Sequence, residues 1–193
     1  MADLIEGADG KARCRWCGTD PLYVAYHDDE WGRPVHDDDR LFEKLCLEGF
    51  QAGLAWITIL RKRPAFREAF AGFAIDVVAE FGDDDVERML GDAGIVRHRG
   101  KITAAIGNAR RAQELIAGVG SIDAHVWSFA PEGRRRPTAF SEVPALTPES
   151  TALSKDLKKR GWRFVGPTTV YAFMQSMGIV DDHLDGCWVP PVI

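Results

Sequence analysis

The stretch Asp92–Arg110, DAGIVRHRGKITAAIGNAR, decides the fold class. Gly94 is a stop signal for one helix, and a short basic turn separates it from a second helix that we expect to begin near Gly100. The apolar residues of the second helix recur at the spacing of one helical face: Ile102, Ala105, Ile106 and Ala109. The stretch therefore predicts two helices joined by a tight turn.

The same helical signals continue along the rest of the chain. Apolar residues spaced by threes and fours predict a helix over Leu41–Trp56, where the preceding aspartates can cap its start. Asp84 with Glu87 resembles a capping box, and Ser121 can cap a further helix. Two more helices are expected over Leu153–Lys159 and Val170–Met177, and a surface loop over Pro131–Pro148. Because period-two alternation and internal repeats are missing, we predict an all-α fold in a single domain, residues 1–193.

Composition narrows the class of protein further. The chain is 46% hydrophobic and 27% charged, with four cysteines, which is too few for a disulfide scaffold. It has no apolar run long enough to span a membrane. Its first residues are acidic, unlike a secretory signal, so we expect a cytoplasmic protein that does not bind membranes. The net charge of −5 argues mildly against nucleic acid. Yet Arg97–Arg111 holds five basic residues and no acid, and Lys155–Arg163 holds five against one.

The basic turn is a candidate contact for a phosphate. A glycine-bearing turn that presents backbone N–H groups at the start of a helix suits an anion. The residues that would hold it are Gly94, Arg97, Arg99 and Lys101. Such an element holds the DNA backbone without reading its sequence. Taken alone, a helix pair with a glycine turn is more often purely structural.

Glu48 is an anomaly in an apolar helical face. It shares that face of the helix expected over Leu41–Trp56 with four apolar side chains. A buried ionised acid needs a partner or a raised pKa. Aromatic residues that could sandwich a flat cationic ligand crowd the same part of the chain: Trp16, Tyr23, Tyr26, Trp31 and Trp56. The alternative is a boundary glutamate that reaches solvent, and periodicity alone does not separate the two.

Soft metal ligands lie at both ends of the chain. Cys14 and His27 are near the start, and His183 and Cys187 are near the end, with three residues between them. Two thiolates and two imidazoles would complete a closed tetrahedral Zn²⁺ shell. The spacing alone favours unrelated buried residues, and Cys17 could replace Cys14 as a ligand.

At this point the sequence resembles a known family, bacterial 3-methyladenine DNA glycosylase I of the helix-hairpin-helix glycosylase superfamily. The resemblance runs from Arg13 to Cys187. It rests on DPLYVAYHDDEWG (20–32), LCLEGFQAGLAWITIL (45–60), the 92–110 stretch and LSKDLKKRGWRFVGPTTVYAFMQSMGIVDDHLDGC (153–187). In the 92–110 stretch Val96 replaces the usual second hairpin glycine. The resemblance implies a helix-hairpin-helix core over about 40–165 and a small zinc-stapled lobe from about 12–39 and 166–190.

The resemblance also implies the activity and its residues. The chain would excise N3-methyladenine from alkylated double-stranded DNA as a monofunctional glycosylase in base excision repair, acting as a monomer. Glu48 would be the catalytic residue, an acceptor for the amine edge of the base, in a base pocket lined by Trp16, Tyr23, Tyr26, Glu48 and Trp56. Gly53 and Leu54 would form the wedge into DNA. One structural Zn²⁺ per chain would be bound by Cys14, His27, His183 and Cys187.

Alternatives remain for the chemistry and for the function. Asp123 could be the acid that many superfamily members use, although a first-turn helix acid is the simpler reading. Lys101 could attack the sugar as a Schiff-base lyase, but a basic helix start facing phosphate explains it more simply. A non-catalytic DNA-binding module of the same fold is the main rival function. A zinc-stabilised peptide-binding protein is the other.

Overall fold

The computed structural model describes residues 3–133 and 135–191; the rest of the predicted domain lies outside the described residues. The helices are α1 (Pro21–Asp29), α2 (Asp38–Gln51), α3 (Trp56–Ala69), α4 (Ile75–Ala79), α5 (Asp83–Gly91), α6 (Arg99–Val119), α7 (Ile122–Trp127), α8 (Pro148–Lys159) and α9 (Pro167–Ser176). Two strands, β1 (Leu4–Glu6) and β2 (Ala12–Cys14), and short 3-10 turns at Arg15–Cys17, Ala71–Phe73 and Phe140–Glu142 complete the elements.

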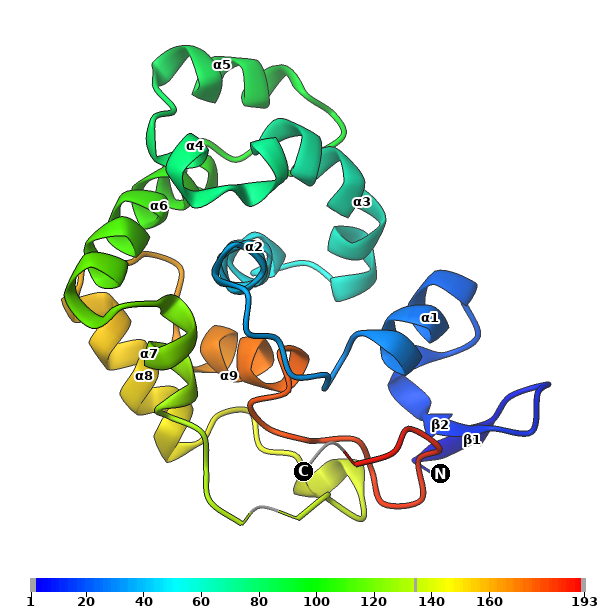
Figure 1. The fold of residues 1–193 in the computed structure, drawn as a ribbon. Helices are drawn as coiled ribbons and strands as arrows, with labels where there is room; N and C mark the ends of the chain where they lie inside the picture. Colours follow the sequence, from blue (N-terminus) through cyan, green and yellow to red (C-terminus); the bar gives the residue numbers. More distant parts are fainter. Residues whose placement is uncertain (1–2, 134, 192–193) are drawn as a thin grey trace.

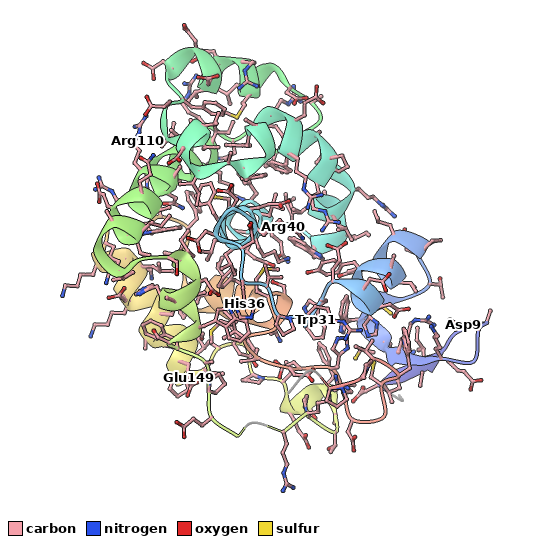
Figure 2. All side chains as sticks on the ribbon, viewed as in Figure 1. Asp9, Trp31, His36, Arg40, Arg110 and Glu149 are labelled. Carbon is pink, nitrogen blue, oxygen red and sulfur yellow. The ribbon has the colours of Figure 1, made fainter. Side chains whose placement is uncertain are left out.

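Helix α2 is the centre of the fold. It is viewed end-on in Figure 1, with α3 to α7 arranged around it and α9 below. Every residue from Leu41 to Phe50 is buried, and side chains fill the space between α2 and its neighbours (Figure 2). A helix covered on all sides can keep a charged side chain only if that charge finds a partner.

The helix predicted over Leu41–Trp56 ends five residues early. Helix α2 stops at Gln51, and α3 begins at Trp56. The break has two physical causes. Gly53 adopts a φ of +85°, which an L side chain rarely adopts. The buried Lys101 ammonium donates to the carbonyls of Phe50 and Ala52, at 2.9 and 2.7 Å, and so satisfies the end of the helix from outside.

The hairpin predicted at 92–110 is present as α5 and α6, with a shorter first helix and a longer turn. Helix α5 ends at Gly91 rather than Gly94, and α6 begins at Arg99. Gly94 packs against α3, because a Cβ there would lie 2.8 Å from that of Ala65. The cap of α5 is Asp85, whose carboxylate accepts from the Gly82 amide, and not the predicted Asp84–Glu87 pair.

The all-α prediction holds for the core but missed one element. Strands β1 and β2 form a two-stranded antiparallel sheet, with Leu4 opposite Cys14. The C-terminal segment joins this sheet, since the Trp188 amide donates to the Ala12 carbonyl at 2.8 Å. The chain therefore brings its first and last described segments together, as Figure 1 shows.

The predictions for the C-terminal half of the chain agree with the structure. Ser121 caps α7 by accepting from the Ala124 amide. Helices α8 and α9 correspond to the two C-terminal helices predicted, although α9 ends at Ser176, one residue before the predicted end. Helices α1, α3 and α4 were not anticipated. Within the described residues, no helix has the length and apolarity needed to span a bilayer.

Candidate functional site

A cavity of about 500 Å³ opens between α1, α2, α9 and the 140–145 segment. Its size is that of a small-molecule site. All five residues predicted to line a base pocket, far apart in sequence, lie in its wall: Trp16, Tyr23, Tyr26, Glu48 and Trp56. Trp31, one of the aromatic residues noted in the same part of the sequence, also lines it, and Phe140, Val143, Tyr171 and Asp182 are among the lining residues that were not predicted.

The aromatic wall is built from rings that brace one another. Trp16 packs edge-on against Tyr23 and Trp31, with ring centroids 5.2 and 4.9 Å apart. The Tyr26 ring lies 5.5 Å from that of Trp56. Helix α1 positions both tyrosines, and Asp20 caps its start by accepting from the Leu22 and Tyr23 amides. The result is a rigid wall with ring faces available for stacking.

Glu48 is buried, as its helical face predicted, and it has a partner that the sequence reading missed. The Lys44 ammonium, one helical turn earlier, lies 2.7 Å from Oε1 of Glu48. It also donates to the Tyr26 hydroxyl at 2.9 Å and lies 3.2 Å from the centroid of the Trp56 ring. The pair of charges at positions 44 and 48 is the signal that could have revealed this contact.

Burial makes the charged form of this lysine less favourable. Desolvation lowers the pKa of Lys44 to about 8, even though the Glu48 carboxylate favours the charged form. The ammonium is therefore close to its titration range at neutral pH. Its charge also offsets that of Glu48, so the cavity wall is not a simple negative patch.

A second polar wall faces the cavity from α9 and the segment after it. Asp182 accepts hydrogen bonds from the Tyr171 hydroxyl at 2.5 Å and the Gln175 amide at 2.8 Å. All three side chains line the cavity. Asp182 precedes the predicted ligand His183, and no periodic pattern marked it as a site residue.

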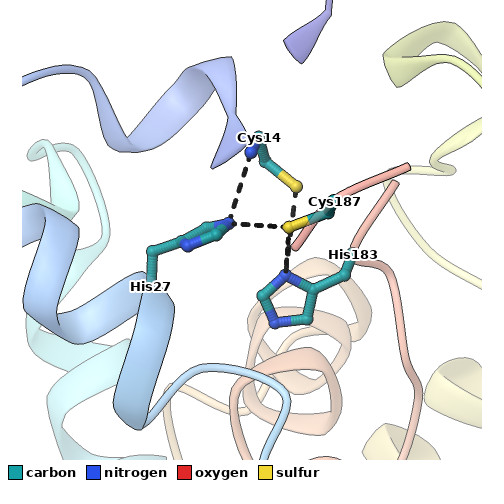
Figure 3. Close-up of side chains that lie close together, drawn as sticks. All are labelled: Cys14, His27, His183 and Cys187. Atoms are coloured by element: carbon teal, nitrogen blue, oxygen red, sulfur yellow. Dashed lines mark hydrogen bonds between the residues drawn. The ribbon is translucent and has the colours of Figure 1, made fainter. Parts of the chain in front are cut away.

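The four predicted metal ligands converge on one point. The ligand atoms of Cys14, His27, His183 and Cys187 lie within 4.8 Å of one another. Figure 3 shows the four side chains gathered together. Cys187 Sγ is 3.6 Å from both the His27 Nε2 and the His183 Nδ1 atoms. The group could hold a metal ion. Cys17 is outside it, with its thiol directed to the Gly18 carbonyl.

The outward-facing nitrogen of each histidine is already engaged. His27 Nδ1 lies 2.8 Å from the Asp28 carboxylate, and His183 Nε2 lies 2.9 Å from the Trp31 carbonyl. Carboxylate and carbonyl partners of this kind fix the tautomer, and so leave the opposite ring nitrogen available to a metal. Asp28 is in turn held by Arg13 and by the indole of Trp188. Burial opposes ionisation of Asp28, yet these hydrogen bonds lower its pKa to about 2.

The predicted wedge residues form an exposed turn beside the cavity. Gly53 and Leu54 lie between α2 and α3, next to the lining residues Gln51 and Trp56. The Leu54 side chain is 42% exposed, so this turn presents an apolar side chain at the surface.

The predicted phosphate contacts divide into two groups. Arg97 and Arg99 are exposed, and Arg99 forms only a surface ion pair with Glu87. Lys101, in contrast, is buried with its ammonium on the carbonyls that end α2, so it does not face the surface as predicted. The Gly94 amide donates to the Asp92 carboxylate at 2.7 Å, which removes the free N–H expected there.

Asp123 lies away from the cavity wall. Its carboxylate pairs with His36 at 2.8 Å on the surface, and its amide donates to Asp38. This placement agrees with the reading of Asp123 as a first-turn helix acid.

Comparison with known proteins gives a consistent answer. A family model described as methyladenine glycosylase matches residues 16–190. DNA-3-methyladenine glycosylase 1 of Escherichia coli is 51% identical over 181 residues, which cover 93% of this chain and 97% of that protein. A crystal structure of 3-methyladenine DNA glycosylase I superposes with a TM-score of 0.89 at 48% identity, covering 93% of this chain and all of that one. A structure addressing 3-methyladenine recognition by the Staphylococcus aureus enzyme gives 0.89 at 36% identity, covering 94% and 97%.

Proposed function

The chain belongs to the methyladenine glycosylase family, and we propose that it releases N3-methyladenine from alkylated double-stranded DNA. The observation that carries the proposal is the 500 Å³ cavity, where aromatic faces and a buried carboxylate meet. An enzyme that acts on a base must take it out of the duplex, and a damaged base costs less to extrude. Such a cavity suits a flipped, flat purine.

The reaction requires modest assistance from the protein. N3-methyladenine in DNA carries a positive charge, so its glycosidic bond is weak. When the C1′–N9 bond breaks, the electron pair goes to the base, which departs neutral. Water then forms the new bond to C1′ and loses a proton. The protein therefore has to select, stack and hold the base more than it has to protonate it.

We assign Glu48 the polar contact to the base and the aromatic side chains its faces. The second oxygen of Glu48 can accept a hydrogen from the exocyclic amine. Trp16, Tyr23, Tyr26 and Trp56 supply stacking surface. A desolvated cation–π contact contributes about 2 kcal/mol. The Lys44 ammonium next to Trp56 reduces that benefit, so stacking and shape carry more of the selectivity than the charge of Glu48 alone.

The DNA-facing residues follow from exposure. We propose that Leu54, presented by Gly53, fills the gap left by the flipped base, since an exposed apolar side chain beside the cavity suits a wedge. Arg97 and Arg99 would contact phosphate, and Gly94 would shape their turn by close packing on α3. Lys101 would act indirectly, by fixing the end of α2 that leads into the wedge.

We further propose that the Cys14, His27, His183 and Cys187 group binds one structural Zn²⁺. Zinc bonds of about 2.3 Å to sulfur and about 2.0–2.1 Å to nitrogen imply a tetrahedral S–N edge of roughly 3.6 Å. Three of the four S–N separations lie between 3.6 and 3.9 Å, close to that edge. A closed four-ligand ion leaves no open position for catalysis, so it would serve to join residues 12–39 and 166–190 into one lobe behind the cavity.

The test is incubation with methylated duplex DNA and identification of the bases released by mass spectrometry. We expect N3-methyladenine from the wild-type protein and much less from Glu48→Gln. The matched control is Glu68→Gln, which changes an exposed glutamate on α3 and should release base at the wild-type rate. DNA binding without release of any base would instead favour a non-catalytic module. Wild-type release by Glu48→Gln would remove Glu48 from the proposed role.

A further inference from the structure

The Lys44 ammonium is the common partner of three cavity side chains. Lys44 is nine-tenths buried on the central helix. Its nitrogen contacts the Glu48 carboxylate, the Tyr26 hydroxyl and the Trp56 ring, at 2.7, 2.9 and 3.2 Å. No other buried lysine among the described residues is placed against this cavity wall.

Lys44 stands behind the cavity wall. Tyr26 and Trp56 border both the large cavity and a smaller one of about 120 Å³, whereas Lys44 borders only the smaller one. A base in the large cavity would therefore meet Tyr26, Trp56 and Glu48 without touching the lysine. Any effect of Lys44 on that base acts through these neighbours.

An ammonium has three hydrogens to donate and no lone pair, and this fixes the roles of both neighbours. Glu48 uses Oε1 for Lys44, and no other group in residues 3–133 and 135–191 donates to its second oxygen. The Tyr26 oxygen accepts from Lys44, so its own hydrogen must point elsewhere. That hydrogen has no acceptor among the residues that the structure describes.

We propose that Lys44 is a specificity-determining positioning residue that makes Glu48 an acceptor and Tyr26 a donor toward the bound base. The inference rests on the proposed function. Adenine presents an amine donor beside the N7 acceptor, whereas guanine presents two acceptors, N7 and O6. An acceptor–donor pair in the protein matches the adenine edge. The same pair sets a carboxylate oxygen against O6 of guanine, which disfavours a methylated guanine.

The charge on Lys44 is essential to this arrangement. A neutral amine has a lone pair, so it can accept the Tyr26 hydrogen and withdraw that donor from the base. Burial lowers the pKa of Lys44 to about 8, which brings the change into an accessible range. On α2, Glu48 contacts the ammonium, and Glu43 and Arg40 line the small cavity with it. Asp29, Glu30 and Arg33 lie on the α1 side, and Arg63 and Arg67 on α3.

The first experiment compares free bases. Binding of N3-methyladenine and of N3-methylguanine to the intact protein is measured by tryptophan fluorescence for wild type, Lys44→Met and Lys155→Met. Met keeps most of the length of the side chain without the charge, and Lys155 is an exposed lysine on α8. We expect Lys44→Met to bind N3-methyladenine about tenfold more weakly and to lose about tenfold of its preference over N3-methylguanine, the scale of one hydrogen bond. Lys155→Met should match wild type.

The second experiment needs only the wild-type protein and Lys155→Met. Affinity for N3-methyladenine should fall about tenfold as the pH rises through about 8 in both, because the Lys44 ammonium deprotonates there. The Lys44→Met variant leaves Glu48 unpaired. If it does not fold for that reason, the pH profile of the wild-type protein alone tests the role of Lys44. A flat profile between pH 7 and 10, or a folded Lys44→Met with unchanged preference, overturns the inference. Base release from methylated DNA by wild type, measured alongside, shows whether the proposed function itself holds.

Discussion

Replacing Lys101 by methionine should destabilise the protein, even though a lysine in a basic turn is usually a surface residue. Its ammonium donates to the carbonyls of Phe50 and Ala52 at 2.9 and 2.7 Å, and only 9% of the residue is exposed. Met fills the same volume but cannot donate. The two carbonyls at the end of α2 would then be left without their donor.

The size of the effect follows from these contacts. Each hydrogen bond from a charged donor contributes about 1.5–3 kcal/mol. Burial lowers the pKa of Lys101, which shows that keeping the ammonium desolvated cancels part of that gain. A net loss of about 2–3 kcal/mol remains. For a chain of this length it corresponds to a fall in Tm of roughly 5–10 °C.

Urea denaturation and thermal unfolding, with Lys155→Met as the exposed-lysine control, measure this loss. A Lys101→Met variant within about 0.5 kcal/mol of wild type would behave as an ordinary surface substitution and refute the reasoning. The salt dependence of DNA binding gives a second check. A phosphate contact would reduce its slope by about one when removed, whereas a lysine that only fixes the end of α2 leaves the slope unchanged.

Three further outcomes are expected. Cys187→Ala should lose bound zinc and stability, whereas Cys17→Ala should keep both. Plasma emission spectrometry measures the zinc content, and thermal unfolding measures the stability. Equal zinc content in the two variants would contradict the proposed ligand set. Arg97→Gln and Arg99→Gln should each weaken DNA binding at every sequence and reduce the slope of log affinity against log salt concentration by about one. Fluorescence anisotropy at several salt concentrations measures this slope. An unchanged slope would mean that other residues contact the phosphates. Burial lowers the pKa of His125, so the unfolded chain takes up this proton first and stability falls as the pH drops below about 6.5. His125→Gln should flatten that part of the curve of unfolding free energy against pH, and an identical curve would argue against it.

The sequence predicted helices best where one face is apolar. The stripe in α6 and the serine before α7 gave correct elements because local spacing and capping determine them. Helix α3 has no such signal, since it contains Pro64 and its apolar residues are scattered. Strands β1 and β2 have three residues each, which is too few for an alternation of apolar and polar residues to be recognised. They pair with each other, and the C-terminal segment contacts β2 through the hydrogen bond from the Trp188 amide to the Ala12 carbonyl.

The candidate site was predictable in its residue types but not in its contacts. Glu48 stood out because a carboxylate on an apolar face is rare. Its partner Lys44 did not stand out, because opposite charges four residues apart on a helix usually lie on its solvated surface. Lys101 was misread for a related reason: a long basic side chain can face either a phosphate or a carbonyl, and only tertiary packing decides.

The cavity draws its walls from segments made at very different times during synthesis. Trp16, Tyr23 and Tyr26 leave the ribosome early, whereas Tyr171 and Asp182 come more than 140 residues later. At about 5–20 residues per second, the early aromatic wall waits many seconds for its opposite side. A nascent or truncated chain therefore holds an incomplete cavity, however well α2 and α6 have folded. We expect the chain to bind a base only after Tyr171 and Asp182 have completed the cavity wall.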